Sequence, residues 1–92
     1  MTQTVSECLT AATDSVTVIN DINSKGLSST HLGLGVTQAD ANARVKANVD
    51  HLTTILAYDG TAETPNVKDA SDDKSSYTTA ITTGNTYISN NS

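Results

Sequence analysis

Residues 37–60, TQADANARVKANVDHLTTILAYDG, carry the clearest structural signal in this chain. Thr37 followed three residues later by Asp40 is typical of a helix start, where each side chain can accept a hydrogen bond from a free backbone N–H. Apolar residues then recur at the three- and four-residue spacing of one helix face. They are Ala41, Val45, Val49, Leu52 and Leu56, with Ile55 beside them. Gly60 can supply the left-handed residue that ends a helix. The stretch therefore predicts an amphipathic helix over about residues 38–58.

The N-terminal segment shows the same organisation. Thr4 and Glu7 form a capping-box pattern, and Lys25 and Gly26 suit the last turn and the cap of a helix. The apolar stripe between them consists of Val5, Leu9, Ala12, Val16 and Ile19. The alternative is a strand at SVTVIN, residues 15–20, where β-branched residues crowd together. The capping residues at both ends, and the three- and four-residue spacing of the apolar residues, favour a helix over about residues 5–24.

A third helix is predicted over about residues 73–90. Ser71, Asp72 or Asp73 would cap it. Its apolar face consists of Tyr77, Ala80, Ile81, Gly84, Tyr87 and Ile88. Gly84 lies within that face, where a missing side chain would let another helix approach closely, at a cost of roughly 1 kcal/mol of helix propensity relative to Ala. A fray point in the helix is the alternative interpretation of Gly84.

Two connecting segments separate the predicted helices. In residues 27–37, LSSTHLGLGVT, apolar residues alternate with two glycines, which predicts an extended connector because the glycines weaken a strand. Its apolar side chains need cover, which either the protein's own core or a neighbouring molecule can provide. In the second case the candidate interface residues are Leu27, Leu32, Leu34 and Val36. The loop over residues 60–72 is acidic and long for a helix–helix connection, which is typical of functional or mobile loops.

The composition is that of one small folded domain with a thin core. Leu, Ile and Val together number 18, and the chain has no Phe or Trp, whereas Thr, Ser and Asn number 16, 10 and 8. A protein with a thin core often gains additional stability by binding a partner or further copies of the same chain. The candidate helix-packing residues are Val49, Leu52, Leu56, Ile81, Gly84 and Ile88.

The charge and hydropathy patterns argue against nucleic-acid and membrane binding. Ten acidic and five basic residues give a net charge of −5, without a basic stripe that could release counterions from DNA or RNA. The longest apolar runs are too short to span a bilayer, and the N-terminal MTQTVSECLT lacks the pattern of a signal peptide. We therefore expect a soluble protein made in a cytoplasm.

The sequence offers no pattern for catalytic, cofactor-binding or metal sites. His31 and His51 have no carboxylate or Cys at metal-ligand spacing. Cys8 stands alone, which excludes an internal disulfide, and a small buried residue is favoured over a reactive thiol. An EF-hand register that begins at Asp69 fails because its sixth position, which needs Gly, is Lys74. A solvated loop is favoured there, and we expect a non-enzymatic protein without cofactors.

Two segments resemble a class of small bacteriophage-encoded helical proteins in which an N-V-x-H-L helix is paired with an A-I-x-x-G-x-x-Y-I helix. The segments are residues 44–56, RVKANVDHLTTIL, and residues 77–92, YTTAITTGNTYISNNS. The matching residues are Asn48, Val49, His51 and Leu52, then Ala80, Ile81, Gly84, Tyr87 and Ile88. The intervening loop departs from the pattern because it lacks the aromatic residues that many similar proteins carry there. The resemblance covers about half of the chain and implies a phage origin and association with the virion.

These features predict an all-α domain over residues 1–92, with the second and third helices as an antiparallel hairpin and the first packed across them. The favoured function is that of a non-enzymatic bacteriophage virion structural protein, a capsid decoration or cement subunit. Its partners would be other virion proteins of the capsid or neck, and further copies of itself. The alternatives are a small acidic inhibitor or adaptor that binds a host protein, and a head–tail junction or tail subunit.

Overall fold

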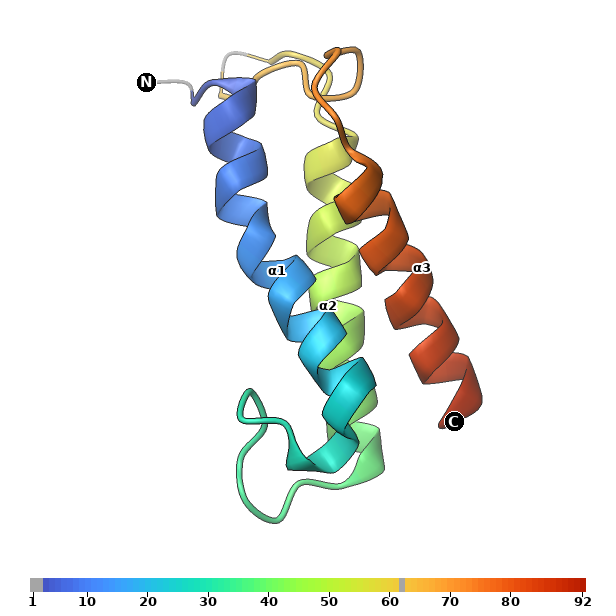
Figure 1. Ribbon diagram of the computed structural model, residues 1–92. Coiled ribbons are helices and arrows are strands. Elements are labelled where there is room, and N and C mark those ends of the chain that lie inside the picture. The colour runs from blue at the N-terminus through green and yellow to red at the C-terminus, as the bar shows by residue number, and fades with distance from the viewer. Residues whose placement is uncertain (1–2, 62) are drawn as a thin grey trace.

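The computed structural model describes residues 3–61 and 63–92, and this part of the chain contains helices and no strand (Figure 1). The elements are α1 (Val5–Lys25), the short 3-10 helix η1 (Gly26–Ser28), α2 (Gln38–Leu56) and α3 (Ser75–Asn90). The prediction of an all-α domain of three helices is confirmed. The predicted helix bounds differ from those observed by at most two residues at each end.

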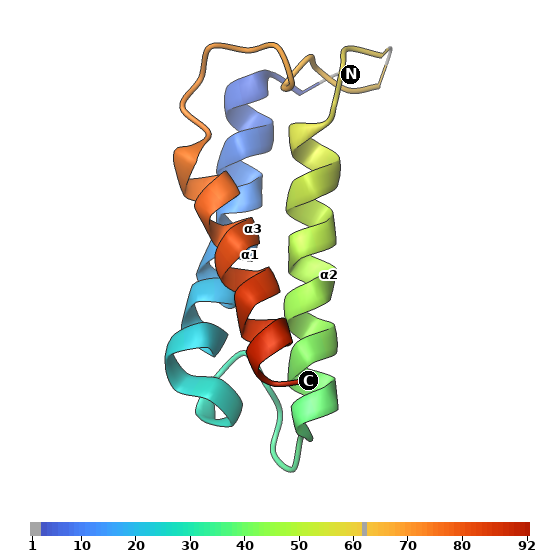
Figure 2. The same cartoon turned by 90° about the vertical axis from the view of Figure 1, so that its right-hand side faces the viewer.

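The three helices lie alongside one another, and each contacts the other two (Figures 1 and 2). α2 runs antiparallel to α1 and to α3, as the predicted hairpin of the second and third helices requires. α1 lies along this hairpin rather than across it, so the molecule is elongated, with extents of 41 × 23 × 16 Å. The connector between α1 and α2 closes one end of the bundle, and the loop between α2 and α3 closes the other.

The predicted capping pairs form at the starts of α1 and α2. Thr4 Oγ1 accepts a hydrogen bond from Glu7 N–H at 3.1 Å, and Glu7 Oε1 accepts one from Thr4 N–H at 2.8 Å. Thr37 and Asp40 make the equivalent pair at 3.1 and 3.2 Å. Both pairs satisfy N–H groups that the first turn of a helix would otherwise leave free. The bond from Thr4 N–H also lowers the pKa of the Glu7 carboxyl.

The end of α2 differs from the prediction. The helix ends at Leu56, and its cap residue Ala57 keeps a right-handed conformation, so Gly60 does not cap it. Gly60 has a φ of +88° and instead turns the following loop, where Asp59 pairs with Asn66 in an isolated antiparallel bridge. Gly60 is thus left-handed as expected, but its position lies beyond the helix.

The start of α3 also differs. The helix begins at Ser75, and the residue at its cap position is Lys74, which makes no side-chain capping bond. One of the three predicted capping residues nevertheless contributes, because Asp73 Oδ1 accepts a hydrogen bond from Ser75 N–H at 2.9 Å. This bond lowers the pKa of the Asp73 carboxyl.

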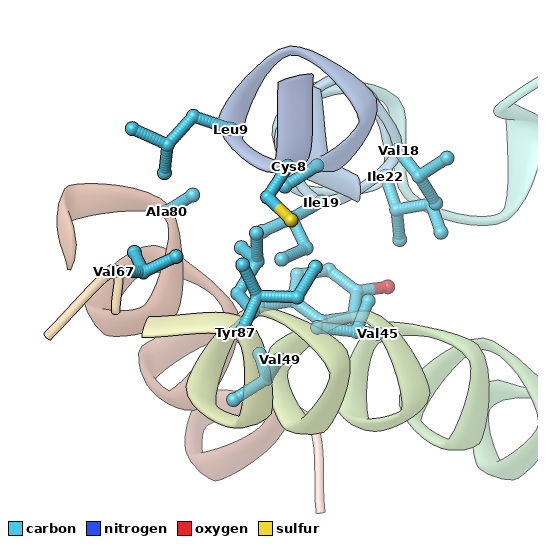
Figure 3. Packing of buried hydrophobic residues seen from close by; sticks show 13 residues of the cluster. Cys8, Leu9, Val18, Ile19, Ile22, Val45, Val49, Val67, Ala80 and Tyr87 are labelled. Atoms are coloured by element: carbon cyan, nitrogen blue, oxygen red, sulfur yellow. The ribbon is translucent and has the colours of Figure 1, made fainter. Parts of the chain in front are cut away.

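The core fills the space between the three helices (Figure 3). Its largest fully buried side chains are Ile19, Ile22, Val45, Leu52 and Val67. The structure places three of the candidate helix-packing residues, Val49, Leu52 and Gly84, among the buried residues. The other three, Leu56, Ile81 and Ile88, are half-buried and pack against the core.

The buried face of α1 and α2 is rotated slightly from the predicted stripe. In α1, Val18 is buried and Val16 is half-buried, although the predicted stripe includes Val16 and does not include Val18. In α2, Ile55 is likewise buried and Leu56 half-buried. Each helix packs against two neighbours at once, so its buried arc is broader than a single line of residues at three- and four-residue spacing.

Gly84 lies against side chains of both other helices. A Cβ atom at this position would overlap Val49 Cγ2, and it would lie 3.1 Å from Val45 Cγ1 and 3.4 Å from Ile19 Cγ2. These distances leave no room for even a methyl group, so the missing side chain sets how closely α3 can approach α1 and α2.

Hydroxyl and amide groups tie α3 to the other helices. Tyr77 OH donates to the carbonyl oxygen of Leu9 at 2.7 Å, which joins the first turn of α3 to α1. At the other end, Tyr87 OH accepts from Gln38 Nε2 at 2.9 Å, which joins α3 to the start of α2. Throughout residues 3–61 and 63–92, no buried side-chain nitrogen or oxygen lacks a hydrogen-bond partner.

Candidate interaction surface

The connector, residues 27–37, is tied to α1 through the Asp21 carboxylate. Ser29 is buried, and its Oγ donates to Asp21 Oδ2 at 2.6 Å. The same Ser29 Oγ accepts from His31 N–H at 3.2 Å, so the tie extends along the connector. On its other side, Asp21 Oδ1 lies 3.1 Å from Lys25 Nζ. The hydrogen bond from Ser29, and secondarily the Lys25 ammonium group, lower the pKa of the Asp21 carboxyl.

Replacing Asp21 with Asn is expected to lower stability at neutral pH and to leave it unchanged in strong acid. Because the pKa of Asp21 is lower in the folded than in the unfolded chain, its carboxylate contributes stability that is fully present above about pH 4 and is lost as the pH falls through the folded-state pKa. Urea unfolding midpoints across pH check this, with Asp14→Asn, on the exposed side of α1, as the control. The same offset between Asp21→Asn and wild type at every pH would contradict this role.

The structure separates the four candidate interface residues into two pairs. Leu32 and Val36 are half-buried, and Leu32 packs against the core. Leu27 is 46% exposed and Leu34 is 106% exposed, and these are the exposed large hydrophobic residues in the described part of the chain. We call Leu27 and Leu34 the connector leucines. The apolar side chains of the connector therefore differ in their surroundings. The core of the protein covers Leu32, whereas Leu34 is fully exposed.

Leu34 lies in a turn of a short loop with fixed ends. On one side, Leu32 N–H donates to the Ser29 carbonyl oxygen at 3.1 Å. On the other side, Thr37 caps the first turn of α2, which begins at Gln38. Gly35 has a φ of +73°, a conformation that residues with a Cβ rarely adopt, and this lets the chain reverse directly after Leu34. An anchored loop that displays one apolar side chain is suited to contact with another molecule.

The opposite end of the bundle is acidic. The loop between α2 and α3 and the first turn of α1 lie together there (Figure 1). The carboxylates of this acidic end are Glu7, Asp59, Glu63, Asp69, Asp72 and Asp73, against the two cations Lys68 and Lys74. Lys74 Nζ donates to the carbonyl oxygen of Ala70 at 2.6 Å, so part of its hydrogen-bonding capacity is used within the loop.

The loop at the acidic end is anchored by Val67, which sequence reasoning missed. Val67 is 0% exposed and belongs to the core. Lys68 N–H donates to the Tyr58 carbonyl oxygen at 2.9 Å, which fixes the loop against the end of α2. The prediction of an acidic loop over residues 60–72 did not include this buried contact with the core. A single Val among polar residues has no periodicity that could have revealed its burial.

The remaining chemically reactive side chains do not form a cluster. In the described ranges, no group of three His, Cys, Asp or Glu residues is arranged to hold a metal ion. Cys8 is buried, with Sγ–H donating to Gln3 Oε1 at 3.4 Å, and His31 and His51 are exposed. None of the described helices combines the length and the apolar character needed to cross a membrane.

The molecule thus presents two surfaces of different character, the connector leucines at one end and the carboxylates of the acidic end at the other. The first is suited to apolar contact and the second to electrostatic attraction of a basic partner. The chain was also compared with protein-family models, curated proteins and solved structures, and none of them matches it.

Proposed function

We propose that this chain is a non-enzymatic structural protein of a bacteriophage virion, where it serves as a capsid decoration or cement subunit. The observation that carries the proposal is the full exposure of Leu34 on an anchored connector. The phage origin is supported by the resemblance of residues 44–56 and 77–92 to small phage-encoded helical proteins. In this function the connector leucines contact the capsid, and the three helices hold the connector in place.

The size of the connector surface fits attachment to a lattice better than a tight one-to-one complex. Covering one leucine contributes about 1.5–3 kcal/mol. Two leucines together fall short of the roughly 8 kcal/mol that corresponds to micromolar affinity. Weak contacts of this kind give stable attachment when many copies, linked to one another or to a repeating surface, bind at once. A decoration subunit meets this condition.

Replacing Leu34 with Ser tests the proposal. The assay adds purified chain to phage particles that lack it and measures the bound fraction by sedimentation. Wild type is expected to bind saturably, and Leu34→Ser to bind about tenfold more weakly or worse, because about 1.5–3 kcal/mol of apolar burial is lost. Circular dichroism should show unchanged helix content, since Leu34 is outside the core.

Two further variants serve as controls for this assay. Ala43→Ser, on the exposed side of α2, should bind like wild type. Leu32→Ser should instead lower the stability of the fold, because Leu32 packs against the core. Binding of Leu34→Ser at the wild-type level would overturn the proposal.

The acidic end supports a second candidate function, a small inhibitor or adaptor that binds a basic surface of a host protein. Attraction between exposed charges is screened beyond about 8 Å at physiological ionic strength. Binding through the acidic end should therefore collapse when salt is raised, whereas attachment through the connector leucines should persist. A head–tail junction or tail subunit would also resist salt, but it would be confined to one site on the particle.

A further inference from the structure

The charged residues of this protein are absent from one whole side of the bundle. All ten acidic and five basic residues precede Ser75, so α3 carries no charge along its length, and it has no His. Its exposed side is made of hydroxyl and amide side chains, among them Thr78, Thr79, Thr82, Asn85, Thr86 and Ser89. Surface helices ordinarily place charged residues on the side that faces water.

The neighbouring edge of α1 is uncharged as well. Thr13 Oγ1 lies 3.3 Å from Tyr77 OH, so this edge of α1 borders α3. Thr17 and Asn20 follow at helical spacing on the same edge and are exposed. The charged residues of α1 recur on a different edge, the one that faces the connector through Asp21 and Ser29. They are Glu7, Asp14, Asp21 and Lys25.

Together, the exposed side of α3 and this edge of α1 form what we call the uncharged face. Figure 1 looks onto it, with α2 behind, as the turned view in Figure 2 makes clear. Ile81, Ile88 and Val16 are half-buried, on the two helices that form this face. Thr82 Oγ1 donates to the Thr78 carbonyl oxygen at 3.3 Å. Thr78 Oγ1 lies 3.1 Å from the Ser75 carbonyl oxygen and 3.3 Å from that of the cap residue Lys74, so its proton has an acceptor at the start of α3. These hydroxyl protons need no acceptor from a partner, which lowers the cost of covering them.

We propose that the uncharged face binds a second copy of this chain. Depletion of charged residues is the compositional mark of the buried centre of protein interfaces. A chain of net charge −5 repels its own copies, and this face is where two copies can meet without setting like charges side by side. A standard interface buries roughly 800 Å² on each partner, and the two longest extents of the molecule, 41 Å and 23 Å, set the upper limit for the face that could supply this area.

The position of the acidic end fixes the direction of pairing. The acidic end adjoins the start of α3. Parallel copies would place their two acidic ends side by side. Antiparallel copies, related by a two-fold axis, instead place the two acidic ends at opposite ends of the dimer, separated by about the 41 Å length of one molecule. That length is several times the screening length of about 8 Å. A two-fold axis through the middle of α3 sets Thr82 close to the same residue of the second copy.

Charge placed at Thr82 tests this pairing directly. Sedimentation and light scattering across protein concentration should show reversible dimers of the wild-type chain that persist when salt is raised. Thr82→Glu and Thr82→Lys should each raise the dimer dissociation constant at least about tenfold, because each sets like charges opposite one another. An equimolar mixture of the two variants should dimerise again, since opposite charges then meet across the axis.

Matched variants separate this pairing from general charge effects and from attachment to a capsid. Ala47→Glu and Ala47→Lys make the same charge changes on the exposed side of α2 and should dimerise like wild type. Leu34→Ser should also dimerise like wild type, because the connector leucines lie outside the uncharged face. If Thr82 variants lose helix content, Asn85→Glu and Asn85→Lys replace them.

Three results would overturn the proposal. The first is a wild-type chain that is monomeric at every concentration. The second is dimerisation of each Thr82 variant at the wild-type level. The third is a mixture of the Glu and Lys variants that stays monomeric, which would exclude the antiparallel two-fold arrangement.

Discussion

Gly84→Ala is expected to destabilise the protein by about 1–3 kcal/mol, which is the usual cost of forcing an extra methyl group into a packed interior. The added Cβ would overlap Val49 Cγ2, and it would lie tightly against Val45 Cγ1. Both neighbours are β-branched residues on a helix, where one χ1 rotamer dominates, so their methyl groups cannot easily turn away. Helix propensity alone predicts the opposite sign, because Ala is favoured over Gly by roughly 1 kcal/mol in a helix interior.

Urea unfolding followed by circular dichroism measures this effect, with Asn85→Ala as the matched control. Asn85 is the next residue of α3 and is exposed, so its replacement should leave stability unchanged or raise it slightly. A loss of stability in Gly84→Ala together with none in Asn85→Ala would assign the cost to the contact with α2.

Removing the obstructing methyl groups should reverse the sign. Val49→Ala alone leaves a cavity and costs stability. In that background, Gly84→Ala should be neutral or stabilising, because the side chain it overlaps is gone. The two substitutions should therefore be strongly non-additive. Stabilisation by Gly84→Ala in the wild-type background would show that α3 does not approach α2 this closely.

Val67→Asp is expected to cost at least about 3 kcal/mol, because it places an unpaired carboxylate in a fully buried position. A domain of this size has a total stability of about 5–15 kcal/mol, so the substitution would remove a large share of it. The loop would then either leave the end of the bundle or hold the introduced carboxyl group in its protonated form. In both cases stability should recover in part when the pH is lowered.

The matched control for this substitution is Ser71→Asp, which adds the same charge to an exposed position of the same loop. It should change stability little, since surface substitutions are usually within about 0.5 kcal/mol. If Val67→Asp does not fold, Val67→Ala still tests the burial, with an expected loss of about 1.5–3 kcal/mol. A Val67→Asp variant as stable as Ser71→Asp would contradict the anchoring of the loop.

The helices could be predicted because their signals are local. Thr4 with Glu7 and Thr37 with Asp40 mark two starts within four residues each, and both capping pairs form. The apolar spacing identifies which side of each helix is buried, although it does not distinguish Val16 from Val18. That choice depends on how two neighbouring helices pack, which no single helix encodes.

The connections could not be predicted to the same extent because their contacts span distant parts of the chain. Val67 belongs to the core of the three helices, which lie on either side of it in the sequence. Leu32 and Leu34 have the same residue type and the same spacing from Gly33, and only the fold covers one and exposes the other. The tie between Asp21 and Ser29 likewise depends on the turn that η1 makes after α1.

The uncharged face shows how a pattern visible in the sequence gains meaning from the fold. The absence of charge after Lys74 can be read directly from the chain. Its significance depends on the edge of α1 that borders α3, which the Thr13 and Tyr77 hydroxyls identify. The connector leucines and the uncharged face are separate surfaces, so a subunit could bind a capsid with one and pair with its own copies through the other.

Quantitative mass spectrometry of purified phage particles tests the proposed function most directly. On the proposed phage origin, particles of the encoding phage would be washed at low and at high salt before the chain is counted relative to the major capsid protein. A decoration subunit held by the connector leucines should remain in many copies per particle after both washes. Absence of the chain from particles washed at low salt, together with its recovery bound to a host protein, would contradict the proposal.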